Sequence, residues 1–80
     1  MKLLLFTWTT KQIVVPVSTI QCIECYKDAD TITRFKVFLP DGFEEVVCEF
    51  DAQSNYYRLL SYLRSDEKDW CVIKCAEKLC

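Results

Sequence analysis

Apolar and polar side chains alternate along residues 34–50 on both sides of a Pro-Asp-Gly sequence. A period of two is typical of strands that bury one face, so this segment predicts two strands joined by a turn. A register that places Val37 opposite Val46 unites the two apolar faces. The same register places Phe35 opposite Cys48, and a slip of one residue would turn one apolar face toward water. We therefore predict an antiparallel hairpin in this register.

The turn of this hairpin contains Pro40 and Gly42, the only glycine in the chain. Proline has a φ near −65° and no N–H group, which suits a type I turn better than the closing pair of a two-residue loop. We expect a four-residue loop over residues 40–43, with Gly42 in the left-handed conformation.

After residue 50 the spacing of apolar side chains changes from two to about 3.6, which predicts an amphipathic helix over residues 52–64. Its apolar stripe consists of Tyr56, Leu59, Leu60 and Leu63. Its opposite face carries Asn55, Arg58 and Ser61. The side chain of Asp51 or Ser54 can accept hydrogen bonds from the first free N–H groups of this helix.

Strand-forming residues also occupy positions 3–9, 13–17 and 20–26. Near the end of the chain, residues 70–75 favour a strand and residues 75–79 favour a helix, and we expect a final strand over 70–75 that ends in a turn. The predicted fold class is α+β, a small antiparallel meander of about five strands with the helix packed on the sheet. No repeat or linker divides the 80 residues, so we expect a single domain.

Part of the chain resembles a known family. The resemblance is carried by residues 13–26 (IVVPVSTIQCIECY), Thr31-Ile32, Asp41-Gly42 and residues 45–47 (EVV). These segments are similar to the meander of LytTR-type DNA-binding domains and of small flagellar or phage regulatory proteins, over residues 13–63. LytTR-type domains read DNA with basic loops, and this chain has no comparable basic cluster. The resemblance therefore implies a β-meander fold and carries over no functional residue.

Charge and composition exclude several classes of function. The net charge is −2 and the chain contains no histidine. It therefore has no strong field to attract a phosphate backbone or an anionic membrane, and it lacks the commonest general base and metal ligand. Glu44 and Glu45 are adjacent in a predicted strand and point to opposite faces, so they do not form a catalytic pair. We predict a protein that is not an enzyme and that has no cofactor, metal, membrane or small-molecule partner.

Six cysteines occupy positions 22, 25, 48, 71, 75 and 80. They would form three disulfides in a secreted chain, a four-cysteine zinc site from the two closely spaced pairs, or a thioredoxin-like dithiol at Cys22 and Cys25. However, Cys22 and Cys25 lie in a predicted strand and would point to opposite faces. We expect reduced cysteines that serve as small apolar side chains, with Cys48 as the clearest example.

The N-terminal residues 1–6 resemble the start of a secretory signal, but the polar residues 7–12 interrupt the apolar run. No small-x-small cleavage site follows. We therefore expect a cytoplasmic protein, with a secreted disulfide-stabilised peptide as the alternative.

Aromatic side chains indicate a contact surface, because exposed aromatics commonly anchor protein interfaces. The candidate interaction surface consists of Phe38, Tyr57, Tyr62 and Trp70. The alternative is that these rings form the edge of the core. The predicted function is a protein–protein interaction module or a small regulatory subunit.

A nucleic-acid-binding regulator is the rival from another class. It would use Arg34, Lys36, Arg58 and Arg64 on one surface. One helix covers only one face of a sheet, whereas residues 20–26 and 46–47 carry apolar side chains on both faces. We therefore expect a homodimer, or binding to a larger protein partner, at micromolar concentration through a sheet edge or the aromatic flank of the helix.

Overall fold

The computed structural model describes residues 1–40, 45–65 and 67–76. Within these ranges the chain forms strands, one α-helix and one 3-10 turn. In chain order these are β1 (Leu3–Thr7), β2 (Gln12–Pro16), η1 (Val17–Thr19), β3 (Cys22–Asp28), β4 (Thr31–Phe38), β5 (Val46–Cys48), α1 (Ala52–Arg64) and β6 (Trp70–Lys74). The α+β class, the helix over residues 52–64 and the final strand are confirmed.

The strands divide between two three-stranded sheets and do not form a single meander. Sheet A has the order β2-β1-β6, and sheet B has the order β3-β4-β5. The 3-10 turn η1 follows Pro16 directly and leads the chain from one sheet into the other. β1 pairs with β2 antiparallel and with β6 in parallel. Local alternation does not predict this parallel pair, because its strands lie at opposite ends of the chain.

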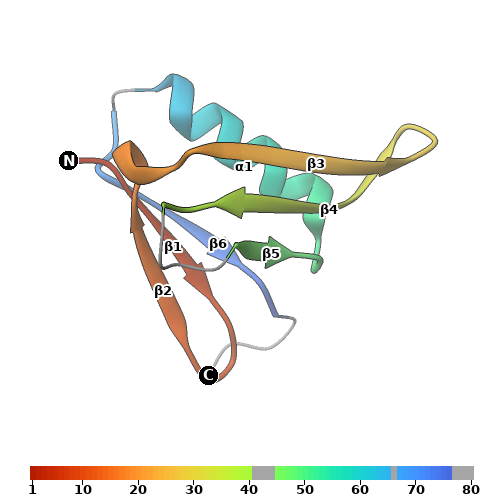
Figure 1. Ribbon diagram of the computed structural model, residues 1–80, viewed down its shortest axis with the longest axis horizontal. Coiled ribbons are helices and arrows are strands. Elements are labelled where there is room, and N and C mark those ends of the chain that lie inside the picture. Colours follow the sequence, from red (N-terminus) through yellow and green to blue (C-terminus); the bar gives the residue numbers. More distant parts are fainter. Residues whose placement is uncertain (41–44, 66, 77–80) are drawn as a thin grey trace.

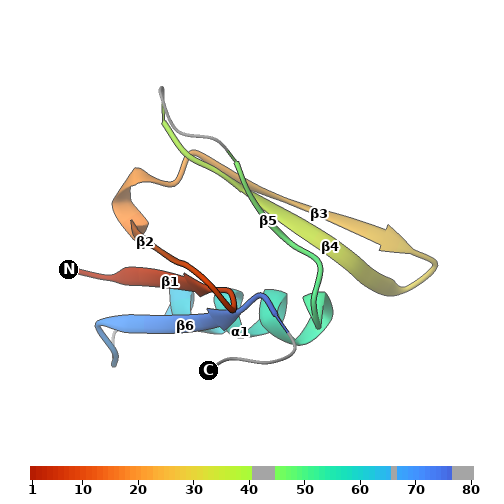
Figure 2. The same cartoon turned by 90° about the horizontal axis from the view of Figure 1, so that it is seen from below.

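The two sheets enclose one core. Figures 1 and 2 show sheet B on one side of the molecule and sheet A on the other, with α1 alongside β6. The helix also packs on the inner face of sheet B through β4. The largest fully buried side chains between these layers are Phe6, Phe35, Leu4, Leu59, Ile73, Val37 and Cys48. The helix therefore fills the space beside sheet A and leaves the outer face of that sheet uncovered.

The hairpin of β4 and β5 has the register that the alternation predicts. Phe35 is opposite Cys48 and Val37 is opposite Val46. All four side chains are buried in the core. The predicted left-handed Gly42 falls in residues 41–44, which lie outside the described residues.

The helix is rotated relative to the predicted stripe. Its buried residues are Ala52, Asn55, Leu59 and Tyr62. Tyr56, Leu60 and Leu63, assigned to the stripe, are half-buried. Asn55, predicted to face water, is 2% exposed. Asp51 occupies the N-cap in a left-handed conformation and makes no side-chain capping hydrogen bond. Leu59 of the predicted stripe is fully buried, and Tyr56 and Leu63 pack against the core. The placement of Asn55 on the water-facing side was wrong, because tertiary hydrogen bonds satisfy its buried amide.

Candidate functional site

Sheet A presents rows of apolar side chains to solvent. Residues that are opposite one another in neighbouring strands share a face, so the registers define these rows. On the outer face they are Pro16-Leu3-Trp70, Val14-Leu5-Val72 and Gln12-Thr7-Lys74. The intervening residues of β1 and β6, which include Phe6 and Ile73, point into the core. We call the first two rows, Leu3, Leu5, Val14, Pro16, Trp70 and Val72, the outer apolar patch.

The outer apolar patch is open to water. Trp70 is 61% exposed and Val72 is 37% exposed. Val14 is also exposed, while Leu3 and Leu5 are half-buried. No member of the patch is charged, and Lys74 lies in the polar row at its border. The patch therefore has an apolar centre and a polar border, which is the arrangement found in protein interfaces.

The helix covers the edge of sheet A and leaves its outer face free. Nη1 of Arg58 donates a hydrogen bond to the carbonyl oxygen of Val72 at 3.4 Å. Nδ2 of Asn55 donates to the carbonyl oxygen of Lys74 at 2.8 Å. Side chains of α1 thus satisfy carbonyl groups that a fourth strand would otherwise bind. Addition of a strand from another protein at the β6 edge is therefore blocked.

A groove of about 570 Å³ extends the outer apolar patch toward the helix. Its walls include Arg58 and Ser61 from α1, and Trp70 and Val72 from β6. Because Trp70 and Val72 belong both to the patch and to the groove, the two form one continuous surface. The groove adds polar and charged groups to one side of the apolar patch.

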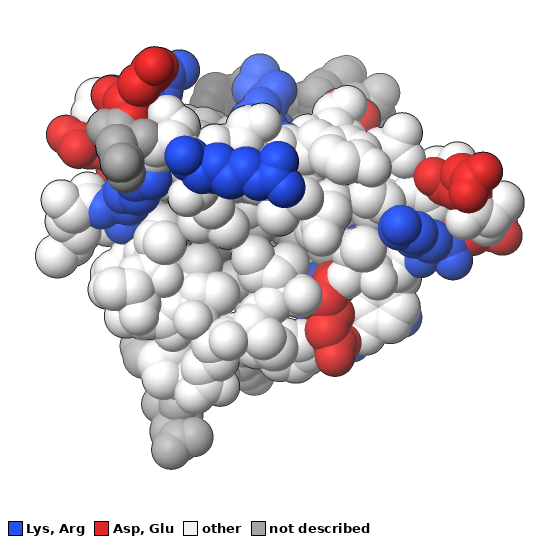
Figure 3. All heavy atoms as spheres, turned by 90° about the horizontal axis from the view of Figure 1, so that it is seen from above, with Lys and Arg blue, Asp and Glu red and all other residues white. Residues whose placement is uncertain are grey.

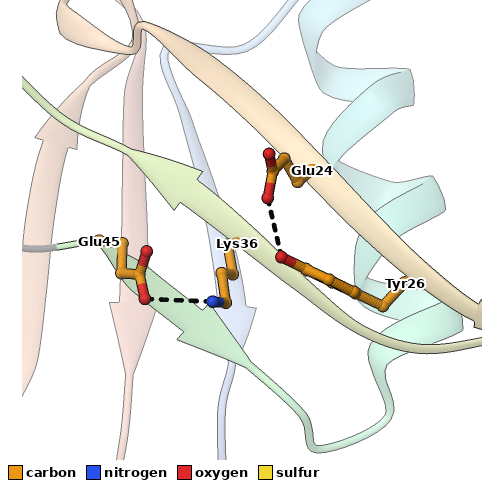
Figure 4. A network of polar contacts seen from close by, with 4 residues as sticks. All are labelled: Glu24, Tyr26, Lys36 and Glu45. Carbon is orange, nitrogen blue, oxygen red and sulfur yellow. Dashed lines mark hydrogen bonds and ion pairs between the residues drawn. The ribbon is translucent and has the colours of Figure 1, made fainter.

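The outer face of sheet B has the opposite character. The hydroxyl group of Tyr26 donates to Oε1 of Glu24 at 2.8 Å, and Nζ of Lys36 lies 3.3 Å from Oε1 of Glu45 (Figure 4). The guanidinium of Arg34 stacks over the ring of Tyr26 at 4.3 Å. The hydrogen bond with Glu45 raises the pKa of Lys36. Polar and charged groups therefore occupy the centre of this face, which also carries the half-buried Phe38 and Val47.

The basic residues of the nucleic-acid hypothesis come from two different parts of the fold. Arg34 and Lys36 belong to β4 and interact with Tyr26 and Glu45 on the outer face of sheet B. Arg58 and Arg64 belong to α1, which packs on the inner face of that sheet. Seen from above, Lys and Arg side chains lie in separate groups, with Asp and Glu beside some of them (Figure 3). The view in Figure 3 contains no continuous basic stripe.

Of the four aromatic residues proposed as a contact surface, Tyr62 and Trp70 line the same groove, and Phe38 and Tyr57 are not among the residues that line it. Trp70 lies in the outer apolar patch, and Tyr57 is exposed on α1. Phe38 is half-buried in sheet B opposite Cys22. Tyr62 is only 5% exposed, and its hydroxyl oxygen accepts a hydrogen bond from the N–H of Leu3 at 3.2 Å. The assignment of Tyr62 to an exposed surface was wrong because its ring fills the space between α1 and the start of β1.

Sequence reasoning identified Trp70 but missed the other members of the outer apolar patch. A signal was present, because residues 3–6 and 13–16 are apolar at both odd and even positions. Strands covered on both sides have this pattern. Here one side is covered by the core and the other is the exposed patch.

The described cysteines Cys22, Cys25, Cys48, Cys71 and Cys75 are free thiols. Cys48 is buried, as the alternation predicted. Burial raises the pKa of the Cys71 thiol. In the part of the chain that the structure describes, no three Cys, Asp or Glu side chains gather in a way that could hold a metal ion. The described helix is also too short and too polar to cross a membrane.

Comparisons with protein-family models, with curated proteins and with solved structures gave no match. The resemblance to LytTR-type domains therefore stays a prediction from the sequence.

Proposed function

We propose that the protein is a non-enzymatic protein–protein interaction module, and that the outer apolar patch is its contact surface. The supporting observation is the position of Trp70, which is 61% exposed beside Leu3 and at the mouth of the groove along α1. Exposed tryptophan within a contiguous apolar patch is typical of interface anchors. A monomer leaves this area in contact with water, and a partner removes it from water.

The partner that fits best is a second copy of the same chain. The centre of the patch carries no charge, so it favours an uncharged apolar surface over an acidic or basic one. A second molecule offers such a surface, and a two-fold axis places patch against patch. The net charge of −2 opposes this approach only weakly.

The size of the patch sets the expected affinity. The three strands span roughly 10 Å between their outer axes and about 17 Å along their length, which is small for an interface. A standard interface buries about 800 Å² on each partner, and the whole chain exposes 5561 Å². The patch alone falls short of that area, and the adjoining groove supplies part of the remainder. We therefore expect a dissociation constant of about 10–50 µM, equivalent to about −6 to −7 kcal/mol.

Sedimentation equilibrium tests this proposal with two matched substitutions. Val72→Glu places a carboxylate in the outer apolar patch, whereas Val47→Glu places the same group opposite Lys36 on the polar face of sheet B. Between about 1 and 300 µM, a range that brackets the expected constant, the wild type should pass from a 9.4 kDa monomer to a dimer. Val72→Glu should weaken association by a factor of about ten or more, and Val47→Glu should leave it unchanged.

Two results would contradict the proposal. A wild-type monomer at the highest concentration would exclude the second copy as the partner. If Val47→Glu and Val72→Glu weakened self-association equally, the contact would lie outside the outer apolar patch. Tyr57→Ala and Phe38→Ser then separate the alternatives, because those residues lie outside the outer apolar patch.

A further inference from the structure

The groove between α1 and β6 has the size of a small-molecule site. Its volume of about 570 Å³ lies within the range of about 300–1,000 Å³ that such sites occupy. One wall is a face of α1, and the other is formed by the segment that leads into β6 and by the start of that strand. The groove was not expected from the sequence, because it forms only where the helix lies beside β6.

The helix wall offers hydrogen-bond donors at the spacing of one helical face. Arg58, Ser61 and Ser65 are three and four residues apart, so they line the same side of α1 and its C-cap. Nη1 of Arg58 donates to the carbonyl oxygen of Val72 at 3.4 Å, which holds the guanidinium at the groove. That bond uses one N–H of the guanidinium, and the group has further N–H donors for a ligand. Oγ of Ser65 accepts the N–H of Glu67 at 3.1 Å, and its hydroxyl hydrogen can be donated to a ligand.

The described residues that line the groove carry an excess of positive charge. Arg58 and Lys68 are basic and Glu67 is acidic, so two positive charges stand against one negative charge. This local charge of +1 contrasts with the net charge of −2 for the whole chain. Nζ of Lys2 donates to carbonyl oxygens at the end of α1, which offsets the negative end of the helix dipole. The groove therefore favours a ligand with a negative charge.

Trp70 gives the groove a flat apolar surface. Its side chain lines the groove and is 61% exposed, so the indole ring is accessible to a ligand. Indole rings stack favourably on other flat rings, including nucleobases. Glu67, on the same side of the groove, can accept hydrogen bonds from hydroxyl or amino groups. The groove thus combines basic donors, a stacking surface and a carboxylate acceptor.

We propose that this groove binds a nucleoside monophosphate. A phosphate monoester carries a charge of about −1.5 to −2 at pH 7, which matches the two positive charges of Arg58 and Lys68. The base stacks on Trp70, and Glu67 accepts a hydrogen bond from a ribose hydroxyl group. A carboxylate has a single negative charge, so it matches the two basic side chains less well. All of these residues belong to one chain, and the proposal does not depend on self-association.

Two-dimensional NMR of isotope-labelled protein tests the proposal, with adenosine 5′-monophosphate (AMP) as the probe. Trp70 also belongs to the outer apolar patch, so a second copy would compete with the ligand for its ring. Val14→Glu changes a residue of the patch that does not line the groove, and binding is then measured on a monomer whether or not the wild type dimerises. We expect saturable shifts of the Trp70 indole N–H signal and of amide signals beside the groove, with a dissociation constant of about 0.1–1 mM.

Two fragments of the probe separate the contributions of its parts. Adenosine has the base and ribose without the phosphate, and inorganic phosphate has neither ring. Each should bind at least about tenfold more weakly than AMP, because each lacks one of the two main contacts.

Arg58→Gln and Arg64→Gln are matched variants. Both residues are exposed basic side chains of α1, but of the two only Arg58 lines the groove. Arg58→Gln should weaken binding of AMP by a factor of about ten, and Arg64→Gln should leave it unchanged. The Trp70 shift caused by a fixed concentration of adenosine should be the same in both variants, because the nucleoside carries no phosphate.

Several results would overturn the proposal. One is the absence of any Trp70 shift at about 5 mM AMP, which is above the expected dissociation constant. Equal affinity for AMP and adenosine would show that the basic side chains do not bind the phosphate, and equal affinity for AMP and inorganic phosphate would show that Trp70 does not stack on the base. Tighter binding of a short 5′-phosphorylated oligonucleotide than of AMP would assign the groove to a polynucleotide and not to a free nucleotide. The comparison among ligands is repeated on wild-type protein, so it does not depend on whether a variant folds.

Discussion

Asn55 shows how a single side chain can connect three segments of this fold. It is the buried polar residue of the described chain, and Nδ2 donates to the carbonyl oxygens of Phe50 and Lys74 at 3.0 and 2.8 Å. The first bond closes the turn between β5 and α1, and the second ties α1 to β6. Loss of the amide would leave two carbonyl groups in the interior without this donor, and such groups are costly to bury.

We predict that Asn55→Leu lowers the free energy of unfolding by about 2–4 kcal/mol, because the two side chains branch at the same carbon but both hydrogen bonds are lost. Ser54→Ala, at an exposed neighbouring position, should change it by less than about 0.5 kcal/mol. Urea denaturation followed by circular dichroism measures both values. Equal stability of Asn55→Leu and wild type would show that the amide does not hold these segments together.

At the scale of elements, Lys2 connects the start of the chain to the end of α1. Its Nζ donates to the carbonyl oxygen of Tyr62 at 3.2 Å and also to that of Ser65. These carbonyl groups lie at the negative end of the helix dipole, where an ammonium group is favourable. We predict that Lys2→Met destabilises the protein by about 1 kcal/mol, while Lys27→Met in β3 has a smaller effect. Thermal unfolding at low and high salt measures the difference, and a larger loss for Lys27→Met would contradict this role for Lys2.

The elements also show which parts of the fold are readable from the sequence. The β4–β5 register and the limits of α1 were predicted because they depend on periodicity within one short segment. The parallel pair of β1 and β6 was missed because it joins distant segments, and the rotation of α1 was missed because partners in β6 satisfy Asn55. For the candidate site, Trp70 was recognised as an anchor. Its neighbours Leu5 and Val72 were missed because their face depends on the sheet pairing.

At the scale of the whole molecule, the two sheets present unlike outer faces. Sheet B carries a hydrogen bond between Tyr26 and Glu24 and an ion pair between Lys36 and Glu45. Sheet A carries the outer apolar patch, since its single neighbouring helix lies along the edge of β6 and not over the face. Within the residues that the structure describes, one α-helix and two three-stranded sheets enclose a core on one side of sheet A, and the apolar side chains on its other side remain exposed or half-buried. The exposed second side is the reason that we expect association.

The fluorescence of Trp70 tests this account most directly, because the indole lies in the proposed contact surface. Trp8→Phe leaves Trp70 as the only tryptophan. On dilution from about 300 µM to about 1 µM, across the expected dissociation constant, the emission maximum should move to longer wavelength as Trp70 enters water. The same protein with Val72→Glu should show the long-wavelength emission at every concentration. Long-wavelength emission from the Trp8→Phe protein at all concentrations would contradict burial of the outer apolar patch against a second copy.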